Sequence, residues 1–423
     1  MSGPLDDWAI EALGLSAMPP ADTEALRRAV LEALAETAER ARSSSPYHGR
    51  ILPENVSRVL TEGPGLVGLP LLTADELVRH GQDMVCLPLD GVARVVSMGT
   101  SGSTGRPKRL FFSDRDLERT MEFFRHGMRP MAGPGDRVLI LLPGRNPDGV
   151  ADLLARALTG LGAVPVLPET LDLPRAVQAL DRGARTVVGA PVPVLQLAES
   201  RPKAGVQDVL LCWDRVPSSL VRRLEAAWDC RVLTHYGTVE TGLGGAVECA
   251  PESGLHLRLP DLVVEVLDPD SDQPLPEGEW GELVVSTPRR EAMPLFRYRT
   301  GDLGRILPGA CACGSFLPRL DRVRGRLSDV WPKAPFPGLN RLDEVLFDLP
   351  SVWDFQAEQT NGEGALLLRL TVKPSPGAEP GLNELVLKTV QRLDPENGLE
   401  IVVAVEDFSS LSWKGAKRTF NNG

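Results

Sequence analysis

The sequence of 423 residues predicts an α/β protein with two domains. Three observations predict it. Apolar strand patterns alternate with helical patterns between residues 136 and 234, and strand patterns without intervening helices follow from residue 262. A cluster of proline and glycine at 332–338 then precedes a last segment of about 90 residues, the size of a small domain. We expect a large N-terminal domain at 1–327, of βα-wound sheets plus an antiparallel β segment, and a small α+β C-terminal domain at 328–423.

The first elements follow from residue type and spacing. Residues 21–42 predict a helix, because Ala, Leu, Glu and Arg dominate and apolar residues recur at helical spacing. In the alternating region the predicted strands are 136–143, 163–167, 186–189, 208–212 and 231–234, and the predicted helices are 150–161, 173–181 and 217–228. Such alternation predicts a mostly parallel sheet with helices on both faces.

The later elements show a different sequence pattern, in which strands follow one another without an intervening helix. Strands at 263–267 and 281–286 are joined by a turn rich in Pro, Asp and Gly, which predicts an antiparallel pair. The last segment predicts a helix at 341–348, a strand at 365–372, a helix at 382–393 and a strand at 399–405.

Composition excludes several functional classes. With 46 basic and 57 acidic residues the net charge is −11, which disfavours nucleic acid and anionic membranes as partners. No apolar run is long enough to cross a membrane, and the N-terminus has no signal-peptide pattern, so we expect a cytoplasmic protein. Six cysteines in a chain of this length do not predict a disulfide framework.

Glycine, hydroxyl residues and a lysine are concentrated at 97–108. Three glycines let successive backbone amides point into one concavity, the hydroxyls add donors, and Lys108 adds positive charge. This inventory suits a polyphosphate, although the Walker spacing is absent. The alternative is a solvated linker.

Two carboxylates follow glycine-rich turns. Glu240, in the loop 237–242 after a strand, is placed to hold Mg²⁺, and Asp302, just after Gly301, is placed to accept hydrogen bonds from a ribose. The alternatives are a solvated glutamate and a turn aspartate. Further on, alternate arginines at 322, 324 and 326 predict a strand with one basic face, which could be merely solvated.

In this order the motifs resemble the adenylate-forming superfamily of acyl-CoA synthetases, adenylation domains and luciferases. The closer resemblance is to its phenylacetate–CoA ligase-like branch, and it extends from about residue 25 to the C-terminus. It rests on the residues at 44–47, 291–302 and 311–314.

The resemblance implies an ATP-dependent carboxylate–CoA ligase that forms an acyl-adenylate with Mg²⁺, and whose small domain moves between the two steps. The partners would be a carboxylic acid and CoA, and a homodimer is plausible by analogy. By the same resemblance Glu240 would hold Mg²⁺, while the nucleotide would be held by Thr100, Ser101, Gly102, Ser103, Thr104, Gly105, Lys108, Tyr236, Gly237, Thr238, Asp302 and Arg326.

The chain also offers a zinc ligand set. Cys249 and His256 have six residues between them, and Cys311 and Cys313 have one. Three thiolates and one imidazole make a closed tetrahedral set, so the expected zinc is structural. Members of the phenylacetate–CoA ligase-like branch look similar at these positions, with a cysteine before a Gly-Leu-His and a later Cys-x-Cys-Gly. The alternative is a group of buried thiols with a satisfied histidine.

The chain departs from the family pattern at four places. Trp213 replaces a glycine in the loop lining the pocket, where it would close the pocket or form its wall. Ser328 stands where the hinge aspartate is expected, and 331–338 lacks an Arg-Gly pair. Gly415 takes the place of the catalytic lysine, so that Lys414 or Lys417 would substitute. These departures keep two alternatives open: an adenylation enzyme without CoA as acceptor, and a catalytically degenerate binder of nucleotide or acyl-AMP.

Overall fold

The computed structural model describes residues 3–15, 23–98, 107–169, 171–330, 338–361, 366–394, 399–407 and 420–422. By its contacts the chain divides into two compact units. The first unit contains 1–130, 146–161 and 235–323, and the second contains 131–145, 162–234 and 324–423. Neither unit is a continuous segment, because the chain passes from one to the other and back. The predicted domain division at 327/328 stays a prediction.

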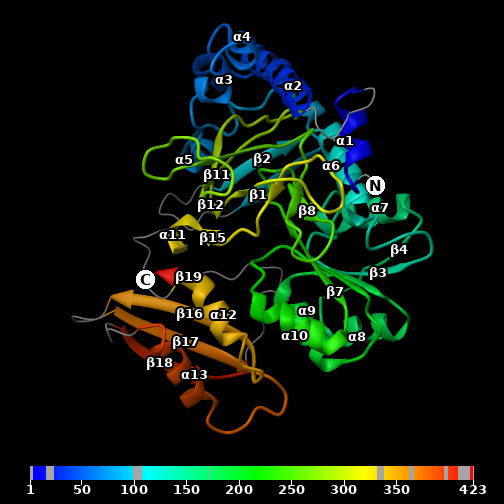
Figure 1. The fold of residues 1–423 in the computed structure, drawn as a ribbon, viewed down its shortest axis with the longest axis vertical. Helices are drawn as coiled ribbons and strands as arrows, with labels where there is room; N and C mark the ends of the chain where they lie inside the picture. Colours follow the sequence, from blue (N-terminus) through cyan, green and yellow to red (C-terminus); the bar gives the residue numbers. More distant parts are fainter. Residues whose placement is uncertain are drawn as a thin grey trace. The chain divides into compact units, whose positions relative to one another are not determined.

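The second unit contains the predicted parallel sheet. Its strands pair in the order β4-β3-β5-β6-β7, and all four pairs are parallel. The strands are β3 (Arg137–Leu141), β4 (Val164–Val166), β5 (Thr186–Gly189), β6 (Asp208–Leu211) and β7 (Arg231–Tyr236), of which β7 ends in the first unit. Of the helices between them, α8 (Leu173–Asp181), α9 (Pro191–Ser200) and α10 (Ser218–Trp228) belong to the second unit, whereas the helix between β3 and β4 belongs to the first (Figure 1). The predicted α/β class is confirmed.

The C-terminal elements also belong to the second unit. A sheet with the order β18-β17-β16-β19 carries the helices α12 and α13. The elements are β15 (Gly325–Arg326), α11 (Leu327–Val330), α12 (Leu339–Leu346), β16 (Val352–Asn361), β17 (Leu366–Pro374), α13 (Leu382–Gln391), β18 (Leu399–Val405) and β19 (Phe420–Asn422). One apolar core joins Leu220 and Leu224 of α10 with Leu342 of α12 and Phe355 of β16.

The first unit begins with helices that pack on one another around buried apolar side chains. Its helical elements are α1 (Asp6–Ala12), α2 (Thr23–Ser44), α3 (Pro46–Ile51), α4 (Val56–Thr61), η1 (Gly65–Gly68), α5 (Ala74–His80), η2 (Leu89–Gly91), α6 (Asp114–Met128) and α7 (Val150–Gly160). A hairpin of β1 (Arg94–Met98) and β2 (Lys108–Phe112) sets Met98 opposite Lys108. The hairpin therefore brings together the two ends of the glycine-rich segment.

Antiparallel strands make up the rest of the first unit. β10 (Val263–Leu267), β11 (Gly281–Ser286) and β12 (Tyr298–Gly304) pair in sequence order, which confirms the predicted antiparallel segment. The end of β7 continues through β8, β9 and β14 to β13. These strands are β8 (Ala246–Glu248), β9 (Leu255–Leu257), β13 (Ile306–Leu307) and β14 (Arg319–Leu320).

The predicted strand with an arginine face is wrong. Residues 321–324 are irregular, and β15 is only two residues long. Gly325 has a φ of +137°, outside the β region, and so interrupts the pleat that would align alternate side chains. Arg322 instead lies 3.4 Å from the buried carboxylate of Glu248. Arg326 is exposed in β15.

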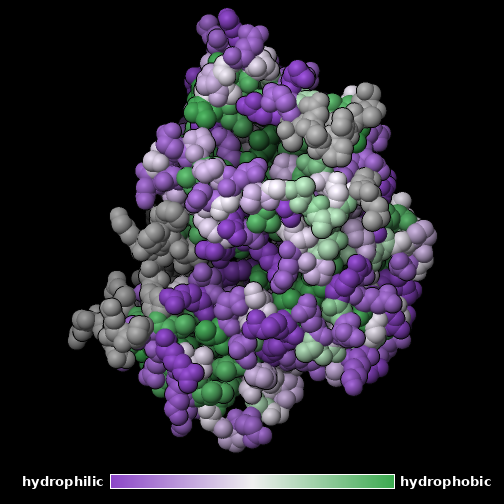
Figure 2. Space-filling view, viewed as in Figure 1, coloured by the Kyte–Doolittle hydropathy of each residue, from purple (hydrophilic) through white to green (hydrophobic). Residues whose placement is uncertain are grey.

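Hydrophilic side chains cover much of the face drawn in Figure 2 and are interrupted by smaller hydrophobic patches. Among the described residues, no helix combines the length and the apolar character that a membrane span needs.

Candidate active site

The side chains of Lys108 and Tyr298, which lie far from Glu240 in the sequence, meet it at one buried point. Lys108, at the start of β2, contacts Glu240 Oε1 with its Nζ, and Tyr298, at the start of β12, donates its OH to the same oxygen at 3.1 Å. The side chain of Glu240 is buried. Burial would raise the pKa of Glu240, but the Lys108 ammonium and its hydrogen bond outweigh burial and lower it. Glu240 therefore stays ionised, as a ligand for a hard cation must.

Asp302 is held by a second tyrosine. Tyr236, at the end of β7, donates its OH to Asp302 Oδ2 at 2.9 Å, and the backbone N–H of Asp302 donates to Thr300 Oγ1 at 3.0 Å. Burial and the neighbouring Asp302 raise the pKa of Tyr236 well above its usual value, and Glu240 adds to that rise. The charges of both carboxylates thus act on Tyr236.

The loop that carries Glu240 is fixed from both sides. The Thr238 N–H donates to Thr241 Oγ1 at 2.9 Å, and Arg290 Nη1 donates to the backbone carbonyl of Glu240 at 2.7 Å. At Gly237 a Cβ would lie 2.8 Å from the carbonyl oxygen of Leu243, so the loop closes only with glycine there. These contacts hold the loop in its conformation within this structure.

The structure describes part of the predicted site. It brings together Lys108, Tyr236, Glu240 and Asp302 in the first unit, beside Gly237 and Thr238. Arg326 belongs to the second unit. The predicted residues that lie outside the described part of the chain are Thr100, Ser101, Gly102, Ser103, Thr104, Gly105, Lys414 and Lys417.

Sequence reasoning missed the roles of Tyr298 and Arg290. A tyrosine four residues before Asp302, in a run with polar neighbours, is a signal that could have pointed to Tyr298. Arg290 had no such signal, because its contact with Glu240 spans fifty residues of chain.

Trp213 occupies an unusual backbone conformation. Its φ is +76°, in the region that glycine adopts freely and other residues avoid. This conformation explains why a glycine is expected at that position. Trp213 lies in the second unit, two residues after the end of β6.

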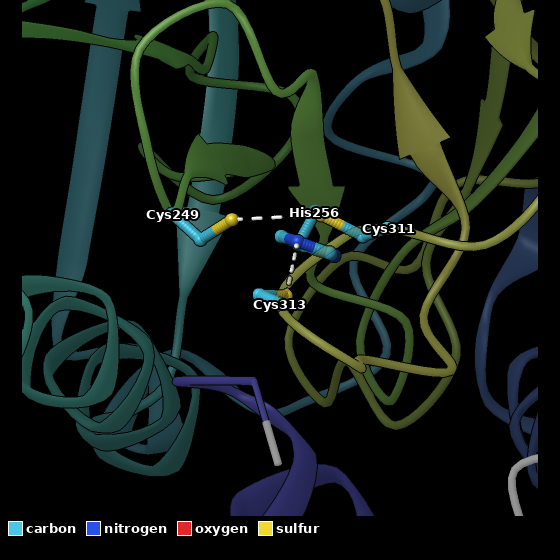
Figure 3. Close-up of side chains that lie close together, drawn as sticks. All are labelled: Cys249, His256, Cys311 and Cys313. Carbon is cyan, nitrogen blue, oxygen red and sulfur yellow. Dashed lines mark hydrogen bonds between the residues drawn. The ribbon is translucent and has the colours of Figure 1, made fainter. Parts of the chain in front are cut away.

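The four predicted zinc ligands converge in the first unit (Figure 3). Cys249 follows β8, His256 lies in β9, and Cys311 and Cys313 lie in a turn that Gly314 closes by donating its N–H to the Cys311 carbonyl. All four donor atoms lie within 4.8 Å of one another.

The spacing of these atoms fits a tetrahedral ion. Cys249 Sγ lies 3.7 Å from Cys311 Sγ, and Cys313 Sγ lies 3.5 Å from His256 Nε2. Ordinary zinc bond lengths place two sulfurs about 3.8 Å apart, and a sulfur and a nitrogen about 3.5 Å apart, on a tetrahedron. Burial lowers the pKa of His256, which keeps its imidazole neutral as ligation requires.

The sequence matches the family of AMP-binding enzymes over residues 70–293, just over half of the chain. The chain belongs to the AMP-binding enzyme family. Among curated relatives, it is 29% identical to the phenylacetate-coenzyme A ligase of Thermus thermophilus, over 76% of this chain and 75% of the relative. It is 26% identical to the enzyme of that name from Escherichia coli, over 59% of this chain and 58% of the relative. The resemblance to the phenylacetate–CoA ligase-like branch is confirmed.

Solved structures share the fold. A 2-hydroxyisobutyryl-CoA ligase in its postadenylation state superposes with a TM-score of 0.74 at 20% identity, covering 93% of this chain and 92% of that one. A benzoate CoA ligase from Burkholderia xenovorans superposes with a TM-score of 0.53 at 17% identity, covering 72% of this chain and 65% of that one. Both likenesses support the architecture of this family member.

Proposed function

We propose that the protein is an ATP-dependent ligase that joins an aryl or acyl carboxylic acid to CoA through an acyl-adenylate. One observation carries the proposal: two buried carboxylates, Glu240 and Asp302, are each held by a tyrosine hydroxyl within one unit of an AMP-binding enzyme. One carboxylate suits a magnesium ion and the other suits the hydroxyls of a ribose.

The two-step reaction requires positioning of the substrates and stabilisation of charge, and it does not require a covalent enzyme intermediate. In the first step a carboxylate oxygen of the acid attacks the α-phosphorus of ATP, and pyrophosphate leaves. In the second step the CoA thiolate attacks the acyl carbon, and AMP leaves with the oxygen. Mg²⁺ would supply charge neutralisation on the phosphates, and Glu240 would hold it while Lys108 lies beside that carboxylate.

The assignment of Asp302 is tested by Asp302→Ala. Losing two charge-assisted hydrogen bonds to the ribose should weaken ATP binding roughly 10- to 100-fold, while the chain still folds with a melting temperature lower by about 5 °C, because the Tyr236 hydroxyl loses its acceptor. Calorimetric titration with ATP measures the binding. Glu279→Ala, at an exposed carboxylate on the turn before β11, is the matched control and should bind normally. Unchanged affinity in Asp302→Ala would remove Asp302 from the ribose site.

The acceptor is tested separately from adenylation. Carboxylate-dependent exchange of pyrophosphate into ATP, over a panel of acids, reports the first step, and consumption of CoA reports the second. The absence of an Arg-Gly pair at 331–338 favours one competing function, adenylation followed by transfer to an acceptor other than CoA. Exchange without CoA consumption supports that alternative, and ATP binding without exchange indicates a degenerate binder.

The proposal includes a structural zinc at Cys249, His256, Cys311 and Cys313, supported by the spacing of their donor atoms. Four protein ligands leave no open position for substrate. Metal analysis of protein purified without chelator should find about one zinc per chain, and Cys311→Ser should lose it and melt at a lower temperature. Cys230→Ser, outside the cluster, is the control. Absence of zinc from the unaltered protein would leave the cluster as free thiols.

A further inference from the structure

The turn that carries two of the predicted zinc ligands is hydrogen-bonded to a segment from the other end of the sequence. Ser315, two residues after Cys313, donates its hydroxyl to Asp6 Oδ1, and the same hydroxyl oxygen accepts the backbone N–H of Leu317 at 3.2 Å. These residues all lie in the first unit. The bond therefore joins the zinc turn to α1, which carries Asp6, 309 residues before Ser315.

The backbone that precedes α1 packs directly on the same serine. A Cβ at Gly3 would lie 2.5 Å from Ser315 Cβ, closer than two non-bonded carbons approach, so this contact requires glycine. The Gly3 N–H donates to Asp6 Oδ2 at 2.6 Å, so that each carboxylate oxygen of Asp6 has a donor. Asp6 thus holds Gly3 against Ser315.

Asp6 is a buried carboxylate close to the zinc ligands. Only 2% of the residue is exposed, and within the described part of the chain no Lys, Arg or His pairs with it. Hydrogen bonds to a buried charge are strong, because losing them would leave the charge without compensation. Burial lowers the pKa of His256, and the Asp6 carboxylate is near enough to oppose that shift. Asp6 is therefore close to the ring of His256 as well as bonded to the turn of Cys311 and Cys313.

The opposite side of α1 packs on α6. The ring centre of Trp8 lies 6.2 Å from that of Phe123 and 6.1 Å from that of His126, both in α6 (Figure 1). Leu5 and Ala9 are fully buried. Residues 3–12, which we call the N-terminal strap, thus have an apolar anchor on α6 in addition to the polar anchor on the zinc turn. Loss of the polar anchor should therefore leave the chain folded.

We propose that Asp6 is a positioning residue for the zinc site, and that zinc binding and docking of the N-terminal strap stabilise each other. The inference rests on the structural zinc that the proposed function includes. A turn already fixed through Ser315 loses less conformational entropy when its two thiolates bind the ion. Coupling between two binding events is reciprocal, so the bound ion in turn holds the strap.

The affinity for zinc tests the positioning role. Asp6→Ala removes both hydrogen bonds and should weaken zinc binding about 10- to 100-fold, as is usual when a residue that orients metal ligands is lost. Competition with a chromophoric chelator measures the affinity. Asp7→Ala removes the same charge from an exposed position in the same helical turn, so it is the matched control and should bind zinc normally. Equal affinities in the unaltered protein and Asp6→Ala would overturn the proposal.

A second variant approaches the same bond from the zinc turn. Ser315→Ala removes the donor to Asp6 Oδ1 and should also weaken zinc binding. It decides the question if Asp6→Ala does not fold.

Hydrogen exchange tests the coupling and separates it from a merely structural role. In the unaltered protein, removal of zinc should speed exchange of the backbone amides at 5–12 about 10-fold, while the amides of α10 in the second unit keep their rates. In Asp6→Ala the strap should exchange at nearly the same rate with and without zinc, whereas Asp7→Ala should keep the dependence on zinc. Strap amides that do not respond to zinc in the unaltered protein would refute the coupling.

The outcomes also separate this inference from the proposed function. A chain that binds no zinc would remove both the structural zinc and the role of Asp6. Zinc that binds equally well without Asp6 would remove the role of Asp6 alone. The ligase activity is decided by pyrophosphate exchange, which is measured independently of both.

Discussion

The positive φ of Trp213 disfavours any residue that carries a Cβ. At a φ of +76° a Cβ costs about 1 kcal/mol, which glycine does not incur. We expect Trp213→Gly to be more stable than Trp213→Ala by about 1 kcal/mol, the reverse of the usual order of these residues. Urea unfolding of the two variants measures the difference. A glycine variant less stable than the alanine variant would contradict a strained Trp213.

His48 makes the stability of the protein depend on pH. Only 1% of the residue is exposed, and burial lowers its pKa from 6.5 to about 4. The neutral ring is favoured in the folded state, so its stabilisation is complete above pH 6.5 and is lost as the pH falls towards 4. The loss approaches roughly 3 kcal/mol for one such group.

The measurement is the free energy of unfolding at a series of pH values. His48→Gln should reduce the slope between pH 6.5 and 4 without abolishing it, because burial also lowers the pKa values of His126 and His235 to about 4. The substitution also removes the edge contact with Phe296. His80→Gln, at a far more exposed ring, is the control and should keep the slope. An unchanged slope in His48→Gln would rule out this histidine as a source of acid sensitivity.

At the scale of residues, the sequence alone pointed to Glu240, Asp302 and Lys108, because their motifs are local. It did not point to Tyr298 or Arg290, whose contacts with Glu240 join segments that lie far apart in the chain. Local sequence patterns indicate the candidate site residues, whereas the residues that hydrogen-bond to them lie in other elements.

At the scale of elements, α10 lacks a capping side chain of its own. Its N-cap is Pro217, and the first amides of the helix, Ser218 N and Ser219 N, donate instead to the carboxylate of Glu344 in α12 at 2.8 and 3.1 Å. A neighbouring helix thus supplies the anion that an N-terminus favours.

Removing that carboxylate should loosen the packing of α10 on α12. Glu344→Ala is expected to lower the free energy of unfolding by about 1 kcal/mol. Glu384→Ala, at an exposed acidic residue in the first turn of α13, has no such contact among the described residues and should change stability by less than half as much. Denaturant unfolding compares the two. Equal losses would contradict a cap from α12.

The strands of the parallel sheet could be predicted because their periodicity is strong. The strands β3, β5 and β6 are continuous apolar runs that fit burial on both faces. α9 was not predicted, because Pro191 and Pro193 look like helix breakers, yet both fall in the first turn, where proline is tolerated. β16 was not predicted either, although it pairs with β17 along nearly its whole length.

At the scale of the whole molecule, the grouping of elements could not be predicted. The structure packs α12 and β16 into the same apolar core as α9 and α10, a contact that no sequence pattern indicated. Arg223 reinforces this packing by donating to the carbonyl oxygens of Phe347, Leu349 and Val352. Which apolar faces meet depends on complementary surfaces, and a sequence pattern shows only that a face is apolar.

The sequence by itself determined the α/β class, the order of the strands in the parallel sheet and of the helices α8 and α10, the family and the residue types of the site, because these depend on periodicity and on short motifs. Tertiary structure alone decided which tyrosine holds which carboxylate, that the donor atoms of the four predicted zinc ligands lie within 4.8 Å of one another, and that arginines gather behind Glu240. Each of these arrangements brings together side chains separated by many residues, and only the packing of the folded chain fixes such distances.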